Sequence, residues 1–496
     1  MESKEEKVRI KLTKVPLESE KREIRSRRRR TFLICIACFL LLMVGGLTGF
    51  AISGMVRGTS VAMFKTNKFD KILSHFKSVW LYKNDYEDLE TTMEDKAFYG
   101  MTRFEDDPYS TYMSKSELEE FASGINMNYV GIGAQYTYTN DVATITRVFK
   151  ESPAEKGGLL PGDIIFTING DTLEGLDSEG IKERIIGEEG TPVNITVKRG
   201  GEEVELTFIR GAIEYTVYCE ANDEDDYVYL DIMSFGKSTA DECIKYLDEY
   251  KDYSKLIINL RDNSGGYQDS VQEVAGLFLG KNVVVLNETD NNGITKSYET
   301  IVKEYYDNFK KIVVITNEGT ASAAEVLAIA LKEEHPDCTL VGTTTYGKGV
   351  VQSSFYLEDG SALKITSSYW TSPNGTSIHK EGVKPDIEVY LDDILYQTAY
   401  VMNESDAYAL DSVSTYTQIA QEGLKFLDYD VHRTDGYFDQ SFLDALKTYK
   451  NDNDLNDNDK LDFDTYNSIL SSIIREYNTN KVKDAQLQKA IEVIEG

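Results

Sequence analysis

The chain is poor in proline and cysteine, and the shortage of cysteine excludes whole classes of protein. Its 496 residues contain 8 prolines and 5 cysteines. Cys35 and Cys38 lie in an apolar run, and Cys219, Cys243 and Cys338 form no Cys-x-x-Cys pair. This spacing excludes a disulfide scaffold and a zinc ribbon, and we expect no metal or cofactor. With 41% apolar and 28% charged residues, the chain has a globular composition, and its length allows about two to four domains.

Positive charge is scarce after residue 30. Residues 1–30 hold 12 Lys and Arg against 6 Asp and Glu, whereas the whole chain has a net charge of −31. The remainder is therefore strongly acidic and would be repelled by phosphate backbones. We therefore expect no nucleic-acid partner. The positive charge of residues 1–30 requires a separate explanation.

Residues 31–56 contain no charged side chain, and their apolar core reads TFLICIACFLLLMVGGLTGFAIS. A membrane-spanning helix needs about 20 such residues. The cluster Arg27–Arg30 stands directly before the run and holds residues 1–30 in the cytoplasm. A cleaved signal peptide is the alternative, but its apolar region normally spans only about 7–15 residues. We expect a single-pass anchor in the cell membrane, with the chain from about residue 57 outside.

The pattern after the anchor predicts a multidomain α/β protein. Residues 57–123 show helical spacing of apolar side chains. Residues 124–212 contain short β-like runs between Gly, Pro and Asn turns. Strands alternate with helices in residues 213–396, which is typical of an α/β layer. Residues 405–475 are mostly helical.

Four motifs follow one another in the β-rich segment: Tyr129-Val-Gly-Ile-Gly133, Ser152-Pro-Ala-Glu-Lys-Gly-Gly-Leu159, Pro161-Gly-Asp-Ile-Ile165 and Ile168-Asn-Gly-Asp171. Their order resembles a PDZ domain. The resemblance implies that the loop Gly131-Ile132-Gly133 offers free backbone N–H groups to a terminal carboxylate, while the adjacent strand edge pairs with the peptide. The ligand implied is the C-terminus of a protein or peptide. Taken alone, Gly131 and Gly133 would indicate only a tight turn.

Ser322 stands where a predicted strand, 311–316, gives way to a predicted helix, 322–334. Ser322 and Glu325 match a capping box, in which the two residues satisfy the first amides of the helix. A serine at a helix N-terminus is also a candidate nucleophile, because the helix dipole and free N–H groups stabilise negative charge there. The four residues Ser322–Glu325 alone favour the cap.

A nucleophilic serine needs a base, and histidine is rare in this chain. The four histidines, His75, His335, His379 and His432, belong to no recognisable pair. A lysine can act instead if burial keeps its amine neutral. Lys348 lies between two glycines directly before an apolar strand, which favours its burial. Gln352, four residues on, can orient the amine.

Two glycine-rich segments, one of which contains Lys348, need separate interpretation. Gly342–Gly349 nearly matches the phosphate-binding pattern GxxxxGK[ST], but Gly349 replaces the hydroxyl residue and a strand rather than a helix follows. A nucleotide-binding protein is therefore a disfavoured alternative. Leu260–Gly266 follows a strand, and its paired glycines leave N–H groups unobstructed, as an oxyanion hole requires.

Together these motifs resemble the carboxyl-terminal processing, or tail-specific, serine peptidase family over roughly residues 68–390. The resemblance implies a homodimer and an active site with Ser322 as nucleophile, Lys348 as base and Gln352 as its assistant. It further implies an oxyanion hole built from Gly265 or Gly266 and from Ala323. Thr320 stands where the family usually has serine, and Ile186-Gly187 replaces a frequent Arg-Gly, which puts a gating arginine there in doubt.

Residues 405–475 resemble a three-helix peptidoglycan-binding module, through the turn Thr434-Asp-Gly-Tyr-Phe-Asp439 before an amphipathic helix. Asn458-Asp459-Lys460 replaces the usual second Asp-Gly, so a helical extension stays open as the alternative. The acidic loop 451–459 lacks the glycine and glutamate of an EF-hand and favours a solvated charge run. Residues 482–496 resemble the family's final helix and would complete the core of residues 213–396.

The sequence thus predicts a membrane-anchored, extracytoplasmic serine endopeptidase. It would recognise protein C-termini through a PDZ domain and cleave with a Ser–Lys dyad. The alternative is a catalytically inactive scaffold that binds peptides and the cell wall.

Overall fold

The computed structural model describes residues 63–139, 142–199, 202–223, 225–397 and 402–496. Within these ranges no helix combines the length and the apolar character that a membrane span requires. The predicted anchor, 31–56, and the basic tail before it lie outside the described residues. The chain divides into two units, residues 1–98 and 99–496, and each is described by itself.

The described part of the first unit is helical, as its periodicity predicts. It comprises α2 (Met63–Val79), a short 3-10 turn (Lys83–Asp85) and the first part of α3 (Leu89–Thr102). The Trp80 ring packs against Phe76 and Tyr86, with centroids 5.3 and 5.4 Å apart. This aromatic cluster joins the end of α2 to the turn that follows it.

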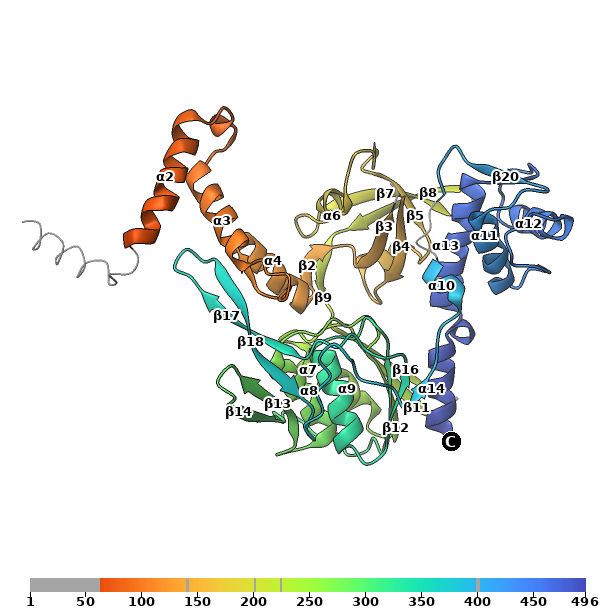
Figure 1. The fold of residues 1–496 in the computed structure, drawn as a ribbon. Coiled ribbons are helices and arrows are strands. Elements are labelled where there is room, and N and C mark those ends of the chain that lie inside the picture. The colour runs from red at the N-terminus through yellow and green to blue at the C-terminus, as the bar shows by residue number, and fades with distance from the viewer. Residues whose placement is uncertain (1–62, 140–141, 200–201, 224, 398–401) are drawn as a thin grey trace, which may run out of the picture. The chain divides into compact units, whose positions relative to one another are not determined.

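The second unit begins within α3 and continues through β1 (Thr111–Met113) and α4 (Lys115–Asn126) to a β-rich domain, the segment predicted to resemble a PDZ domain (Figure 1). In that domain β2 (Asn128–Gly131) pairs with β9 (Gly211–Glu214), and the helices are α5 (Pro153–Lys156) and α6 (Ser178–Ile185). The main sheet has the order β3-β4-β5-β7-β8, so β3 lies at its edge. Its strands are β3 (Ala134–Thr139), β4 (Val142–Val148), β5 (Ile164–Ile168), β7 (Pro192–Arg199) and β8 (Glu202–Ile209), with β6 (Asp171–Thr172) paired to β5.

A six-stranded sheet forms the centre of the predicted α/β core, residues 213–396. Its order is β10-β11-β12-β15-β16-β19, and every neighbouring pair is parallel except β10 with β11. The strands are β10 (Val217–Asn222), β11 (Tyr227–Ile232), β12 (Lys255–Asn259), β15 (Lys311–Thr316), β16 (Cys338–Gly342) and β19 (Ile387–Glu388). The associated helices are α7 (Thr239–Leu247), α8 (Gln268–Leu279), α9 (Ala323–Glu334) and α14 (Ala485–Glu495).

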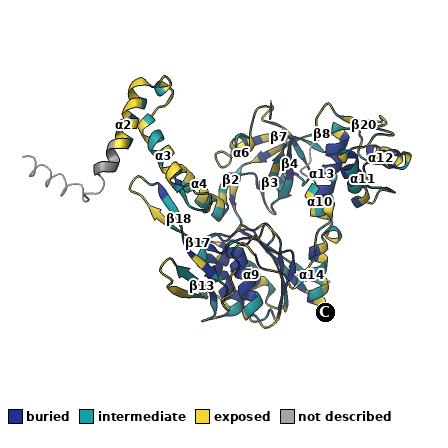
Figure 2. Ribbon diagram, viewed as in Figure 1, coloured by how far each residue is buried: buried dark blue, intermediate teal, exposed yellow. Residues whose placement is uncertain are grey.

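Both faces of this sheet are buried, which explains the continuous apolar runs of its strands. Ile258 and Val314 join the core formed with α8 and α9. Their neighbours Ile257 and Val313 join a separate core with Leu487 of α14. Figure 2 shows α9 as almost wholly buried. The C-terminal helix therefore covers the face of the sheet that α8 and α9 leave open.

A second sheet runs in the order β1-β18-β13-β14, with β17 also paired to β18. It consists of β1 (Thr111–Met113), β13 (Val284–Asp290), β14 (Thr295–Glu299), β17 (Val350–Tyr356) and β18 (Ala362–Thr371). The sequence predicts β runs at 350–357 and 361–369, which correspond to β17 and β18, but it predicts no strands at β13 and β14. In this sheet β18 pairs with β17, the strand after Lys348, and also with β1, the strand before α4.

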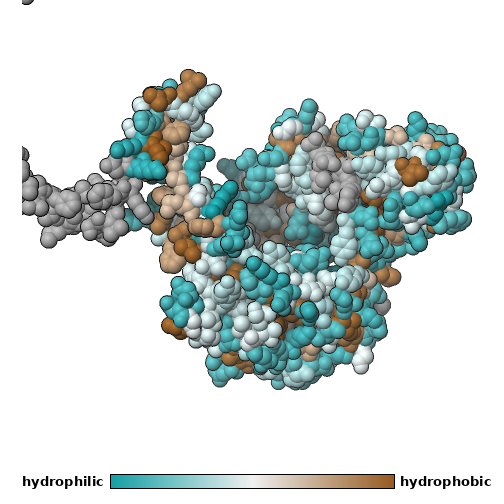
Figure 3. Space-filling model, in the orientation of Figure 1, coloured by the Kyte–Doolittle hydropathy of each residue, from teal (hydrophilic) through white to brown (hydrophobic). Residues whose placement is uncertain are grey.

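Three helices, α11 (Thr415–Phe426), α12 (Gln440–Asp452) and α13 (Phe463–Thr479), pack around one apolar core near the C-terminus. They are accompanied by α10 (Asp393–Gln397), β20 (Ala407–Ala409), β21 (Lys460–Asp462) and a 3-10 turn (Lys481–Lys483). The ammonium of Lys450 is buried among oxygens of the predicted acidic loop, 2.9 Å from Asn458 Oδ1 and 2.6 Å from the Lys460 carbonyl. In the face shown in Figure 3 hydrophilic side chains predominate, in keeping with the acidic composition.

Candidate active site

Three loops meet at one edge of the central sheet. Strands β12, β15 and β16 run parallel, so their carboxyl ends lie side by side. Leu260–Gly266 follows β12, Asn317–Ser322 follows β15, and Thr343–Gly349 follows β16. Binding sites of parallel α/β sheets form at this edge. The topology therefore brings together the three segments that the sequence singles out.

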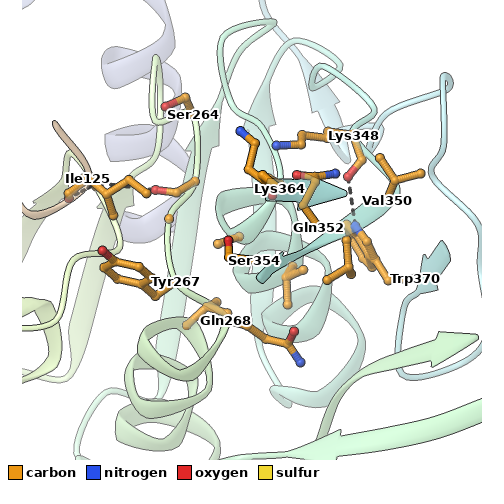
Figure 4. A pocket seen from close by; sticks show the side chains of 18 of the residues that line it. Ile125, Ser264, Tyr267, Gln268, Lys348, Val350, Gln352, Ser354, Lys364 and Trp370 are labelled. Atoms are coloured by element: carbon orange, nitrogen blue, oxygen red, sulfur yellow. Dashed lines mark hydrogen bonds between the residues drawn. The ribbon is translucent and has the colours of Figure 1, made fainter. Parts of the chain in front are cut away.

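The loops surround a cavity of about 570 Å³. All six predicted active-site residues line it, namely Ser322, Lys348, Gln352, Gly265, Gly266 and Ala323. Figure 4 shows Lys348, Lys364 and Gln352 on one wall and Ser264 and Tyr267 on another. Apolar side chains complete the lining, among them Val271, Leu286, Val326, Val350 and Trp370.

Ser322 has a strained backbone conformation at the start of α9. Its φ is +56° and its ψ is −118°, outside the regions that residues other than glycine usually occupy. Such strain costs about 1–3 kcal/mol and clusters at functional sites. The Glu325 carboxylate accepts the Ser322 N–H at 2.8 Å, so the predicted capping box and the strained turn coexist at one residue.

Glu325 does more than cap α9. Its carboxylate is fully buried and accepts the N–H groups of Gly347 and Lys348, at 2.7 and 2.8 Å, and the Thr345 hydroxyl at 2.5 Å. With the Ser322 N–H, four donors satisfy the two oxygens. A buried carboxylate is stable only when it is bonded in this way. Glu325 thus fixes the Lys348 loop onto the helix that begins after Ser322.

The Lys348 amine lies in a largely apolar setting. Its Nζ is 5.0 Å from the centre of the Tyr109 ring, and its carbonyl accepts the Trp370 Nε1–H at 2.9 Å. Burial lowers the Lys348 pKa below its ordinary value, and the charge of Lys364 lowers it further, whereas Glu325 acts in the opposite direction. Desolvation therefore favours the neutral amine, as the two flanking glycines suggest.

Gln352 lies on β17, just after an irregularity in its pairing with β18. Its Nε2 is buried and has no hydrogen-bond partner among the described residues. Burying an unbonded amide is costly, so this group is available to a bound molecule. Figure 4 shows the Gln352 amide on the cavity wall near Lys348.

Paired glycines allow the Leu260–Gly266 turn to approach Ser322. A Cβ on Gly265 would lie 2.9 Å from Ser322 Cβ and 2.9 Å from the Ala323 nitrogen. The Gly265 N–H donates to Asn263 Oδ1 at 2.8 Å, and the Gly265 carbonyl accepts the Phe235 N–H. In the described part of the chain the N–H groups of Gly266 and Ala323 have no such partner. Of the two predicted glycines, Gly266 is the one with a free donor.

Thr320 stands where the resemblance would place a serine, and its hydroxyl makes two hydrogen bonds between neighbouring loops. Its Oγ1 donates to the Leu260 carbonyl at 2.7 Å and accepts the Asn317 N–H at 3.0 Å. A second bond, from the Ala321 N–H to the Asn263 carbonyl, also joins the two loops. The loop Asn317–Ser322 and the glycine turn are therefore tied together.

The geometry supports neither a histidine base nor a nucleotide ligand. The lining residues of the cavity, all of them described, include no histidine. His335 bonds the Asp337 N–H, and His379 packs against Tyr369. The loop Thr343–Gly349 continues into strand β17, whereas a phosphate-binding loop would lead into a helix.

Gly131 ends β2, and Ile132 and Gly133 join it to β3 in the predicted PDZ segment; none of the three lines this cavity. Gly133 has a φ of +80°, and a Cβ there would lie 2.4 Å from Ser152 Cβ, so only glycine fits. The carbonyls of Ile132 and Gly133 accept the Ala154 and Phe149 N–H groups. Their own N–H groups are unbonded in the described structure, and the loop leads directly into the edge strand β3.

The sequence analysis missed the part that three residues play at this site. Glu325 shows only its capping pattern, because its bonds to Gly347 and Lys348 bridge distant segments. Tyr109 and Lys364 lie in the segments Gly100–Ser110 and Asp359–Thr366, which belong to the family resemblance, but nothing in those segments indicates that the two side chains approach Lys348. Burial and a hydrogen bond with Tyr346 raise the pKa of Tyr109 to about 12, so its ring stays neutral beside Lys348.

Comparison with known proteins agrees with this geometry. Residues 226–389 match the model of peptidase family S41, and residues 130–209 match that of the PDZ domain. The chain is 32% identical to the carboxy-terminal processing protease CtpA of Bacillus subtilis over 476 residues, covering 94% of this chain and 99% of the relative. It is 34% identical to CtpB of the same organism over 436 residues, covering 85% and 89%.

The fold and the matches define a serine-type peptidase that carries a PDZ domain. The chain belongs to the carboxy-terminal processing proteases of peptidase family S41. The fold class predicted for its two central domains is confirmed.

Proposed function

We propose that the protein is an endopeptidase in which Ser322 attacks the scissile carbonyl carbon and Lys348 acts as general base. The Lys348 amine takes the proton from Ser322 Oγ as the C–O bond forms. The resulting ammonium then gives that proton to the departing amine as the C–N bond breaks. Water, deprotonated by the same amine, hydrolyses the acyl-enzyme and restores Ser322.

The observation that carries this proposal is the shared cavity of a strained serine and a partly buried lysine. A lysine can accept a proton near neutral pH only when its surroundings disfavour the charged form. The burial of Lys348 provides that condition, and no histidine competes in the cavity lining. Gln352, with its unbonded amide on the same wall, is suited to orient the amine.

An oxyanion hole from Gly266 and Ala323 fits the same geometry. Both residues line the cavity, and both N–H groups lack partners in the described structure. Donors of this kind stabilise the charge that develops on the carbonyl oxygen, and removing one typically costs about 10²- to 10³-fold in kcat. The Gly265 N–H is engaged with Asn263, so we assign the first donor to Gly266.

Casein hydrolysis separates this peptidase from a catalytically inactive scaffold. We expect residues 57–496 to hydrolyse casein and the Ser322→Ala variant to leave it intact. Equal thermal unfolding of the two proteins would show that only the chemistry is lost. An inactive wild type, or a fully active Ser322→Ala variant, would contradict the proposal.

The PDZ domain is proposed to select substrates by their C-terminal carboxylate. The free N–H groups of Ile132 and Gly133 and the open edge of β3 support this mode of recognition. Each charge-assisted contact contributes about 1.5–3 kcal/mol. Amidating the C-terminus of a substrate should therefore raise its KM about 10- to 100-fold, and equal KM values for acid and amide would contradict the assignment.

The membrane anchor remains a proposal that rests on residues 27–56. A reporter enzyme that folds only outside the cytoplasm should be active when it is fused after residue 60, and a cytoplasmic reporter at the same point should be inactive. The reverse result would place the catalytic part inside the cell.

Peptidoglycan binding by residues 405–475 is likewise proposed, from the turn that precedes α12. Residues 57–496 carrying Ser322→Ala should pellet with purified cell-wall sacculi and be released by soluble wall fragments. A protein that stays in the supernatant would leave only the interpretation as a helical extension.

A further inference from the structure

The active-site cavity contains a second lysine. Lys364 lies on β18, opposite Ser354 of β17 and Thr111 of β1, and its side chain lines the same cavity as Lys348. In Figure 4 both amino groups are directed toward the same side of the cavity. Both side chains thus line one cavity, and the charge of Lys364 contributes to the lowered pKa of Lys348.

No described carboxylate balances the Lys364 charge, since none lies within 4.0 Å of its Nζ. The ammonium rests over the Phe121 ring, 4.5 Å from the ring centre. A partly buried ammonium without a counter-ion is costly, and one contact with an aromatic ring offsets only about 0.5–2 kcal/mol. The fold therefore keeps an uncompensated positive charge in the cavity.

Lys348 faces charged or titratable groups from three other elements. Glu325 of α9 accepts the backbone N–H of Lys348, but four donors already occupy its two carboxylate oxygens. Tyr109, before β1, presents a neutral ring that is itself paired with Tyr346. Lys364 of β18 is the cation among these groups, and Lys348 is the more deeply buried of the two lysines.

We propose that Lys364 is a positioning residue for Lys348, whose fixed positive charge in the shared cavity keeps the Lys348 amine neutral and ready to accept a proton. Two like charges at close range cannot both persist in a desolvated site, and the more deeply buried amine gives up its proton first. Burial lowers the pKa of Lys364 as well, but Lys364 is less buried than Lys348 and rests against the Phe121 ring, so it keeps its charge when Lys348 loses its proton. This inference depends on the proposed role of Lys348 as base.

The pH profile of kcat/KM on a neutral peptide substrate tests the proposal. In Lys364→Met the midpoint of the rising limb should move upward by about one pH unit, a tenfold loss at neutral pH that is recovered at high pH. Lys364→Glu should move the midpoint further upward, and Lys364→Arg, which keeps the positive charge, should keep the wild-type midpoint. Lys296→Met is the matched control, because Lys296 also lies over an aromatic ring, 4.1 Å from the Tyr298 centre, but lines no part of the cavity.

A second measurement follows the Lys348 amine without catalysis. In Ser322→Ala protein, the rate at which an amine-reactive reagent modifies Lys348, read by mass spectrometry against pH, reports its neutral fraction. Adding Lys364→Met should shift that titration upward by the same amount. An unchanged midpoint in both measurements overturns the proposal, as does a loss in Lys364→Met confined to acidic substrates, which would make Lys364 an anion-binding residue. If Lys348→Ala is fully active, the base assignment itself fails.

Discussion

One carboxylate oxygen joins Ser322 to Lys348, because Oε2 of Glu325 accepts the backbone N–H of each at 2.8 Å. The two residues are 26 positions apart and lie on different loops of the sheet edge. Their relative placement therefore depends on a buried group that takes no part in proton transfer. A shift of either loop would separate the proposed nucleophile from the proposed base, and small misplacements of reacting groups cost large factors in rate.

Glu325→Gln should lower kcat by about 10- to 100-fold and change KM less. The amide keeps one acceptor oxygen, but its NH₂ group meets backbone N–H donors, so one or more charge-assisted bonds of about 1.5–3 kcal/mol are lost. Steady-state kinetics measures the effect. Glu333→Gln on the same helix is the control, since Glu333 accepts from Ser372 and Asn374 outside the cavity. Similar losses in both variants would mean that Glu325 acts only through the stability of α9.

Gly265→Ala should reduce kcat by at least about tenfold in a folded protein. The new Cβ would lie 2.9 Å from Ser322 Cβ and from the Ala323 nitrogen, so the nucleophile loop must move away. Gly293→Ala is a matched control, because Gly293 also has a positive φ, of +77°, but an added Cβ there meets no atom within 4 Å. If the two variants are equally active, the close approach of the turn to Ser322 is unimportant.

Asp484→Asn should destabilise the protein by about 3–5 kcal/mol, because it leaves the Arg261 guanidinium buried without its counter-charge. Arg261 bonds both oxygens of Asp484, at 2.9 and 2.8 Å, directly before the helix that covers the sheet. Chemical denaturation measures the change. Lys489→Gln removes an exposed ion pair on the same helix and should cost less than about 1 kcal/mol. Equal stabilities would show that α14 is held by its apolar face alone.

The buried strands of the core were the easiest elements to predict from sequence. The strand Lys311–Thr316 has the predicted bounds, because its apolar run is buried on both faces of the sheet and is followed by turn residues. The β13–β14 hairpin was missed. Only the beginning of Val284–Asp290 is buried, and its partner β18 lies far along the chain, so local periodicity is weak.

The site shows the same division between local and long-range signals. Ser322, Lys348 and the glycine turn lie in motifs whose local pattern already indicates their place at strand ends. Glu325 also lies in such a motif, but its bonds to the Lys348 loop depend on the parallel order of β15 and β16, which periodicity does not reveal. Lys364 enters the cavity only through the pairing of β17 with β18.

The pH dependence of kcat tests the central claim, that a neutral Lys348 is the base. Because burial lowers the Lys348 pKa, the neutral fraction grows as pH rises through that lowered value, so activity should rise with pH and its midpoint should lie below the ordinary lysine pKa of about 10.4. Lys348→Arg keeps the positive charge but cannot become neutral, so it should be as inactive as Lys348→Ala at every pH. His379→Gln should retain the wild-type profile. Substantial turnover by folded Lys348→Arg, or loss of activity in His379→Gln, would contradict the account.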